Sequence, residues 1–351
     1  MMPKHSVKTV AALLGAMICA PGSAGAQTTA PGAKSPTLAA VKARGHLECG
    51  VHTGIPGWSF PDDKGRWTGL DVDLCRAIAA AIFGDAEKVK YTPTTVQQRW
   101  TVLASGQVDL LSRISTATFK RDTELGFNFP QINYYEGQTF IVRRSANLKE
   151  AKDLDGAAVC VAAGSTEERN AGDWFRERNL KINIVKFEKN DDAIAAYDAG
   201  RCDTYTAGTG ALAGQRRKLK VPADHVIMAG TISRDPQGPV TREGDDGWDN
   251  LVRWVFNGTL IAEHHGVTSA NVDDMKANSK NAEVRVLLGV DGNAGQLLGV
   301  PKEWMYNVVK QVGNFGESFE KTVGMGSELK LERGFNNLWS KGGLMFSPVM
   351  D

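Results

Sequence analysis

The pattern that most limits the fold is an alternation of short apolar strands with amphipathic helices, which runs through the chain twice. The first run places strands and helices, in turn, at 47–51, 71–83, 89–93, 98–105 and 108–111. The second run continues after Gly156 with 157–162, a helix from Thr166, 182–187, 191–199 and 203–206. Alternation of this kind predicts parallel sheets with helices on both faces. Two runs therefore predict two α/β lobes.

Two extended segments, 139–144 and 226–240, separate these runs and are expected to cross between the lobes. The first lobe is then predicted to comprise 38–138 and the second lobe 145–225. The remainder, 241–351, would return to the first lobe and add a C-terminal extension. Ligands of open α/β sheets bind beyond the carboxyl ends of the strands, so we expect the binding site in the cleft between the lobes.

The first 26 residues are typical of a secretory signal peptide. A weakly basic start precedes an apolar run at 10–20, which is too short to span a bilayer, and small residues follow at 24–26. Residues 27–37 are rich in Thr, Ala, Pro and Gly and are interpreted as a flexible leader. We therefore expect an exported, periplasmic protein.

Four cysteines remain once the predicted signal peptide is removed: Cys49, Cys75, Cys160 and Cys202. An even number in an exported chain indicates disulfides, and four cysteines allow three pairings. Spacing favours local pairs, so we predict Cys49–Cys75 and Cys160–Cys202, one in each lobe. A metal site is disfavoured because the chain has no CxxC pair and no close histidine partner.

Charge and motifs exclude several classes of protein. The formal net charge is +1, and no basic stripe with interleaved aromatic residues suggests nucleic-acid binding. No Ser-His-Asp, Cys-His or phosphate-loop arrangement is present, so no catalytic residue, cofactor or metal is predicted. His52 follows the first strand and is interpreted as a loop residue, and the adjacent His264 and His265 do not share a helix face. We expect a monomer.

The segment from Asp109 to Pro130 has the residues that hold a small carboxylic acid. Small hydroxyl donors, among them Ser115 and Thr116, follow a predicted strand and precede Arg121. A guanidinium can hold a carboxylate through two parallel hydrogen bonds. The alternative is a loop rich in Ser and Thr that carries a surface arginine.

Nearly all of the mature chain resembles the periplasmic solute-binding proteins of polar amino acid ABC transporters, bacterial solute-binding protein family 3. The resemblance lies in motifs such as Val41-Lys-Ala-Arg-Gly45, Trp67-Thr-Gly-Leu-Asp-Val-Asp73, Arg121-Asp-Thr123, Asn133-Tyr-Tyr-Glu-Gly137 and Ala199-Gly-Arg-Cys-Asp203. The C-terminal extension and the four cysteines are similar to the general L-amino acid-binding subgroup. This resemblance implies a type II, two-lobe clamp that closes on its ligand and then docks on a membrane permease.

The resemblance also assigns roles to residues. Arg121 matches the arginine that holds the α-carboxylate of the ligand, and Thr116 matches a hydroxyl partner. Gly164-Ser165-Thr166 matches a turn that opens a helix of the second lobe, whose free N–H groups also receive the carboxylate. Ser165 or Thr166 would otherwise be a simple helix N-cap. Trp58 and Phe60 match the loop that places an aromatic ring against the ligand. The alternative is that they pack in the ordinary way or are surface aromatic residues.

Four positions depart from the pattern of the subgroup. Gly208 stands where relatives usually carry the aspartate that receives the α-ammonium group. Ile114, Ala117 and Ala162 replace the usual asparagine, tryptophan and glutamine. A buried ammonium group without a counter-charge costs several kcal/mol. An ordinary α-amino acid should therefore bind poorly unless another acid substitutes, and the candidates are Glu136, Glu167 and Asp203.

The sequence thus predicts an extracytoplasmic binding protein of an amino acid ABC transporter, with a small carboxylate or amino acid ligand. Two alternatives stay open. Some proteins of this fold are periplasmic lyases that resemble cyclohexadienyl dehydratase, although an enzyme needs a positioned acid or base. A ligand-sensing partner of a membrane receptor has no distinguishing mark in the sequence.

Overall fold

The structure is a computed structural model that describes residues 35–351, so the predicted signal peptide and residues 27–34 lie outside the described part. Helix α1 (Pro36–Arg44) begins at once. The Ser35 hydroxyl caps it by accepting from the N–H of Leu38 at 3.0 Å, and it donates to Asp245 at 2.9 Å. Because of this cap and of proline at the first helical position, Pro36 and Thr37 are helical and do not belong to a leader.

The first lobe contains a parallel three-stranded sheet. Its central strand β1 (Leu47–His52) lies between β4 (Val89–Thr94) and β5 (Leu110–Leu111). Helices α2 (Leu70–Phe83) and α3 (Gln98–Ala104) connect these strands. The strands and helices predicted from the first run are therefore present, with boundaries that differ by one or two residues.

The second lobe contains a five-stranded sheet in the order β10-β9-β11-β8-β12. Strand β9 pairs in parallel with β10 and β11, whereas β8 is antiparallel to both of its neighbours. The sheet is therefore mixed, and residues 138–143, largely assigned to a crossing segment from the sequence, form one of its strands. The elements are β8 (Gln138–Arg143), β9 (Ala158–Ala162), α5 (Thr166–Glu177), β10 (Asn183–Phe187), α6 (Asn190–Asp198), β11 (Thr204–Gly208), α7 (Thr209–Arg216) and β12 (His225–Ile227).

Two antiparallel strands, β7 (Tyr134–Glu136) and β13 (Asp235–Gln237), link the two sheets. Gly137 separates β7 from β8, and a Cβ atom there would lie 2.5 Å from the Ser233 carbonyl oxygen. Only glycine lets the two linking segments approach this closely. The remaining short elements are β2 (Phe60–Pro61), β3 (Trp67–Thr68), α4 (Phe119–Thr123), β6 (Phe127–Asn128), η1 (Arg144–Ala146), η2 (Ala151–Leu154), η3 (Pro222–Asp224) and β14 (Thr241–Arg242).

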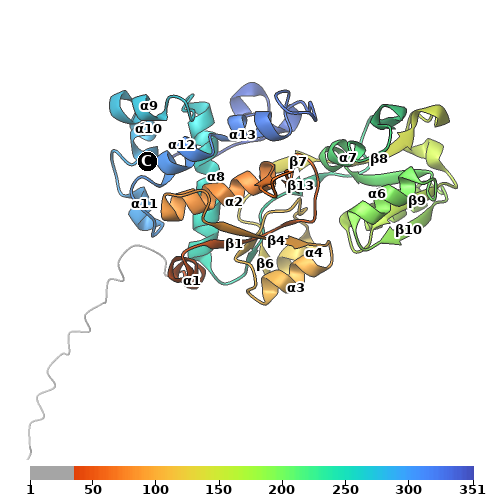
Figure 1. Ribbon diagram of the computed structural model, residues 1–351, viewed down its shortest axis with the longest axis horizontal. Coiled ribbons are helices and arrows are strands. Elements are labelled where there is room, and N and C mark those ends of the chain that lie inside the picture. Colours follow the sequence, from red (N-terminus) through yellow and green to blue (C-terminus); the bar gives the residue numbers. More distant parts are fainter. Residues whose placement is uncertain (1–34) are drawn as a thin grey trace, which may run out of the picture. The chain divides into compact units, whose positions relative to one another are not determined.

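The C-terminal third is helical and packs on the first lobe. Figure 1 shows α8 and α12 beside α2, in agreement with the contacts between these helices. Trp248 and Trp304 are fully buried there, so this part of the chain completes the core of the first lobe. Its elements are α8 (Asp246–His264), α9 (Val272–Asn278), α10 (Ala282–Leu287), α11 (Ala294–Leu297), α12 (Trp304–Gln311), α13 (Phe315–Thr322), η4 (Gly334–Asn336) and η5 (Trp339–Lys341).

Both predicted disulfides are present. One joins Cys49 on β1 to Cys75 on α2, and the other joins Cys160 on β9 to Cys202 just before β11. All four cysteines are buried. Each disulfide therefore ties a strand to an adjacent element within a single lobe.

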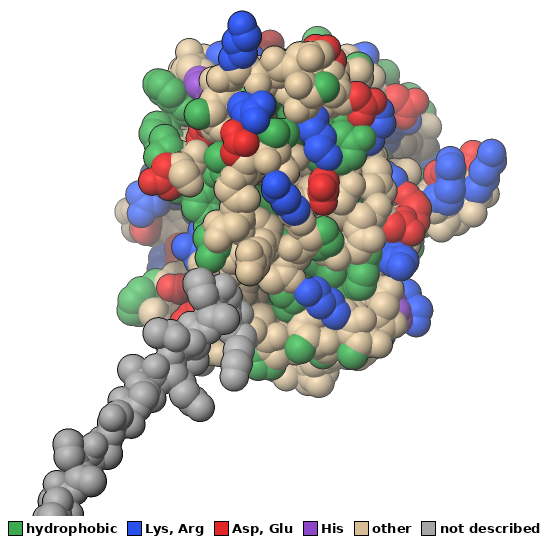
Figure 2. Space-filling view, turned by 90° about the vertical axis from the view of Figure 1, so that its left-hand side faces the viewer, with side chains coloured by type: hydrophobic (Ala, Val, Ile, Leu, Met, Phe, Trp, Pro, Cys, Tyr) green, Lys and Arg blue, Asp and Glu red, His purple; other side chains and the backbone are tan. Residues whose placement is uncertain are grey.

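The surface carries charges of both signs. On the face drawn in Figure 2, basic and acidic side chains are interspersed, in keeping with the net charge of +1. Among residues 35–351, no helix combines the length and the apolar character that a membrane span requires.

Candidate functional site

A cavity lies where the two lobes meet, beyond the carboxyl ends of β1 and β9. Two polar contacts join the lobes beside it: the hydroxyls of Thr116 and Thr166 are 3.4 Å apart, and His52 Nε2 is 3.3 Å from Asn190 Oδ1. The His52 ring accepts at Nδ1 from the N–H of Gly54, so Nε2 carries the proton and donates to Asn190. The lining residues are His52, Ile55, Val96, Arg99, Arg113, Ile114, Thr116, Arg121, Glu136, Ala162, Ser165, Thr166, Glu167, Asn190, Thr206, Ala207 and Ala211.

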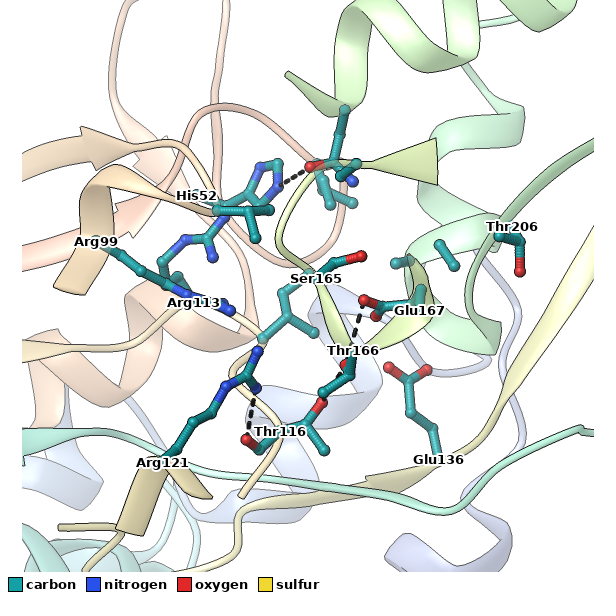
Figure 3. Close-up of a pocket in the computed structure, with 17 residues that line it drawn as sticks. His52, Arg99, Arg113, Thr116, Arg121, Glu136, Ser165, Thr166, Glu167 and Thr206 are labelled. Atoms are coloured by element: carbon teal, nitrogen blue, oxygen red, sulfur yellow. Dashed lines mark hydrogen bonds between the residues drawn. The ribbon is translucent and has the colours of Figure 1, made fainter. Parts of the chain in front are cut away.

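Three buried arginines of the first lobe form one side of this cavity (Figure 3). Arg99 on α3 donates to the hydroxyl of Ser115 at 3.2 Å, and Arg121 on α4 donates to the Thr116 carbonyl oxygen at 2.7 Å. The guanidinium groups of Arg99 and Arg121 lie 4.4 and 5.0 Å from the ring centroid of Trp100. The Nε atoms of Arg99 and Arg113 are buried and have no partner among the described residues.

The three arginines carry positive charges that no neighbouring carboxylate neutralises through an ion pair. None of the three arginines forms an ion pair within residues 35–351. Burial lowers the pKa of each, that of Arg113 to about 10, so Arg113 stays charged at neutral pH. Behind Arg113, burial raises the pKa of Asp71 to about 7, and the positive charge of Arg113 opposes that rise. The cavity therefore favours an anionic group.

The N-terminus of α5 faces the cavity from the second lobe. Ser165 forms the N-cap, because its hydroxyl accepts from the N–H of Glu168 at 3.1 Å. Gly164 has φ of 73°, the left-handed conformation that turns the chain from β9 into the helix. The first turn of a helix presents N–H groups and partial positive charge. The α5 terminus thus adds to the attraction that the arginines exert on an anion.

Two glutamates, Glu136 and Glu167, line the side opposite the arginines (Figure 3). Glu136 ends β7 and accepts from the N–H of Gly210 at 2.7 Å, the hydroxyl of Thr209 at 3.2 Å and the side-chain amide of Gln237. Burial raises the pKa of Glu136 to about 8, and the nearby Asp235 and Glu167 raise it further. The cavity is therefore cationic on one side and acidic on the other.

The predicted ligand-binding residues divide into two groups of five. Ile114, Thr116, Arg121, Ser165 and Thr166 line the cavity together. The other five lie outside its lining. Ser115 accepts a hydrogen bond from Arg99, and Gly164 lines a separate hollow together with Arg121. Trp58 packs edge-on against Tyr134, the Phe60 ring lies under the Lys218 ammonium group, and Gly208 lies against the Glu136 carboxylate.

The candidate acids also separate. Glu136 and Glu167 line the cavity, whereas Asp203 lies at the far end of β11 and accepts from the N–H of Ala158 at 2.7 Å. Of the other departures, Ala162 lines the cavity and Ala117 pairs its backbone N–H with the Pro236 carbonyl. Sequence reasoning missed Arg99 and Arg113, although Arg113 stands in the segment that was singled out.

Ile114 has an unusual backbone conformation, with φ of 45°. The left-handed region is unfavourable for a β-branched residue and much easier for asparagine. The segment that follows β5 therefore holds Ile114 in a strained conformation directly beside the cavity. Among the non-glycine residues with positive φ in the described chain, the other three are Asn147, Asn179 and Lys330.

Comparison with known proteins agrees with this architecture. Residues 47–258 match the bacterial extracellular solute-binding proteins, family 3. The general L-amino acid-binding periplasmic protein of Rhizobium johnstonii is 48% identical, over 97% of this chain and 98% of that protein. The glutamate/glutamine/aspartate/asparagine-binding protein of Rhodobacter capsulatus is 43% identical, over 92% of this chain and 96% of that protein.

A solved structure matches most of the fold. It is an ABC transporter periplasmic binding protein from Brucella ovis with glutathione bound, and its sequence is 48% identical. The match has a TM-score of 0.88 and covers 90% of this chain and 99% of that chain. The fold is thus that of a type II periplasmic binding protein.

Proposed function

Because the chain belongs to bacterial extracellular solute-binding protein family 3, we propose that it is the amino acid-binding component of an ABC transporter. The observation that carries the proposal is the buried guanidinium of Arg121, which forms no ion pair within residues 35–351 and shares the cavity with the α5 terminus of the opposite lobe. Relatives named as amino acid-binding periplasmic proteins, 48% and 43% identical, support this assignment.

The ligand carboxylate would lie between Arg121, Thr116 and the N-terminal turn of α5 at Ser165 and Thr166. Arg121 has already used one Nη1 donor on the Thr116 carbonyl, and its remaining donors are available for two parallel hydrogen bonds. Because the partners of this carboxylate come from both lobes, binding favours the closed arrangement over any open one. Closure would present the surface that docks on a permease.

The test is calorimetry with the purified mature protein against the twenty L-amino acids and glutathione. Glutathione is included because the Brucella ovis relative binds it. We expect at least one of these compounds to bind, and we expect Arg121→Ala to weaken that binding by at least about 100-fold, since it removes one partner of a buried charge pair. Arg66→Ala is the control, because this arginine is exposed and pairs with Asp62 at the surface.

Two results would overturn the proposal. Tight amino acid binding that survives Arg121→Ala would exclude the carboxylate site. Turnover of prephenate or arogenate by the wild-type protein would assign it to the lyases of this fold. The predicted export is tested separately, by N-terminal sequencing of periplasmic protein, which should begin at Gln27.

A further inference from the structure

Glu136 is a carboxylate that faces the cavity without a cationic partner. It forms no ion pair within residues 35–351. Its three neighbours, Gly210, Thr209 and Gln237, each donate one hydrogen bond to it. These donors belong to two separate elements, α7 and β13, which together hold the carboxylate in one orientation. A carboxylate that is already held in one orientation can bind a cation without further ordering of its side chain.

The space that Glu136 occupies exists because residue 208 is glycine. A Cβ atom at Gly208 would lie 2.1 Å from Glu136 Oε1 and 2.5 Å from its Cδ. No side chain at position 208 could therefore coexist with the carboxylate in this position. Glu136 thus comes from β7, which links the lobes, and β11, which precedes α7, leaves room for its carboxylate.

We propose that Glu136, in the space left open by Gly208, receives the α-ammonium group of the bound ligand. This inference rests on the proposed function, since it takes the ligand to be an α-amino acid whose carboxylate lies at Arg121. Figure 3 shows the carboxylate of Glu136 on the side of the cavity opposite the three arginines. A zwitterion placed across the cavity would meet opposite charges at its two ends.

The other two candidate acids suit this role less well. Glu167 is the second residue of α5, where the helix terminus and Arg121 attract the carboxylate of the ligand. Its Oε2 accepts from the hydroxyl of Thr166 at 3.3 Å. Asp203 accepts a backbone N–H at the far end of its strand and does not line the cavity.

Binding of an ammonium group by Glu136 should be coupled to loss of the proton from the Glu136 carboxyl group. The titratable groups that face it are Glu167 from α5, Asp235 from β13 and Tyr134 on its own strand. With its pKa raised to about 8, Glu136 is mostly protonated at pH 7 in the free protein. An ammonium group favours the ionised form, so binding releases a proton, and affinity increases as pH rises towards 8.

The experiment compares amino acids with analogues in which a hydroxyl replaces the ammonium group. The probes are L-glutamate with L-2-hydroxyglutarate, and L-alanine with L-lactate, measured by calorimetry. We expect Glu136→Gln to weaken the amino acids by about 100-fold and to change the hydroxy acids by less than about threefold. Asp203→Asn is the matched control and should change neither class.

A second variant moves the carboxylate without removing it. Gly208→Ala places a methyl group on Glu136 and should also weaken the amino acids selectively. Gly172→Ala is its control, because a Cβ atom there meets only Ile184 Cδ1 at 3.6 Å. Calorimetry in buffers of different ionisation enthalpy should find close to one proton released per L-glutamate at pH 7, and none in Glu136→Gln.

The outcomes separate this inference from the proposed function. If the wild-type protein binds the hydroxy acids as tightly as the amino acids, or if Glu167→Gln and not Glu136→Gln removes the discrimination, the inference is overturned while the carboxylate site stands. If Glu136→Gln weakens both classes equally, the inference is also overturned. If neither L-glutamate nor L-alanine binds, the comparison is made with the L-amino acid that binds in the first test and with its hydroxy acid. If none of the twenty L-amino acids binds, the inference and the amino acid assignment both fail.

Discussion

Burial affects the charge of the two sides of the cavity differently. Burial lowers the pKa of Arg113 only to about 10, so that guanidinium stays charged under physiological conditions. Burial raises the pKa of Glu136 to about 8, so its charge depends on pH and on what lies beside it. Arg113 thus supplies a fixed positive charge, whereas Glu136 gains its negative charge when a cation arrives.

The largest expected effect on ligand affinity comes from removing charge on the arginine side while keeping volume. Arg99 is buried with an unpartnered Nε, so Arg99→Met should weaken anionic ligands by about 100-fold. The same change should stabilise the ligand-free protein by about 2 kcal/mol, because a buried charge is replaced by apolar packing. Calorimetry and urea unfolding measure the two effects. A loss of affinity together with a loss of stability would mean that Arg99 is structural.

On the acidic side, removing the charge should alter the pH dependence of stability. The folded-state pKa of Glu136 lies above the unfolded value, so the folded protein binds more protons between about pH 4.5 and 8 and loses stability as pH rises through that window. Glu136→Gln cannot ionise. It should therefore be more stable than wild type by several kcal/mol at pH 9, since each unit of the raised pKa corresponds to about 1.4 kcal/mol, and similar at pH 4. Parallel pH profiles of the unfolding free energy would contradict this expectation.

A smaller effect on ligand affinity is expected from a substitution that moves α7, on the acidic side of the cavity, away from the first lobe. A Cβ atom at Gly210 would lie 2.4 Å from Trp58 Cζ2 and 3.2 Å from Glu136 Oε2. Gly210→Ala should push α7 away from Trp58 and reduce ligand affinity about tenfold, in line with the usual cost of overpacking. Gly172→Ala serves again as the control. Equal affinities in the two variants would show that α7 does not need this close approach.

The smallest effect concerns the strained residue on the arginine side. Asparagine tolerates φ of 45° better than isoleucine does, so Ile114→Asn should stabilise the ligand-free protein by about 1 kcal/mol. Urea unfolding measures this change. Destabilisation would mean that the apolar packing of Ile114 outweighs its backbone strain.

Much of the fold could be predicted because it depends on local patterns. The strands and helices follow from hydrophobic periodicity, and both disulfides join segments that are close in the chain. The mixed pairing of the second sheet could not be predicted in this way. Strand β8 pairs with β11, whose residues lie more than sixty positions away in the register, and no local signal specifies that partner.

For the cavity, the sequence by itself determined which chemistry was available: Arg121, the hydroxyl of Thr116, a helix that begins after Ser165, and an acid among Glu136, Glu167 and Asp203. Only the tertiary structure decided how these groups divide. It buried Arg99 and Arg113 beside Arg121, left Asp203 outside, and placed Glu136 against Gly208. The physical reason is that a charge pattern in a cavity depends on which distant segments pack together. A missing side chain at one position can thereby make room for a carboxylate from another strand.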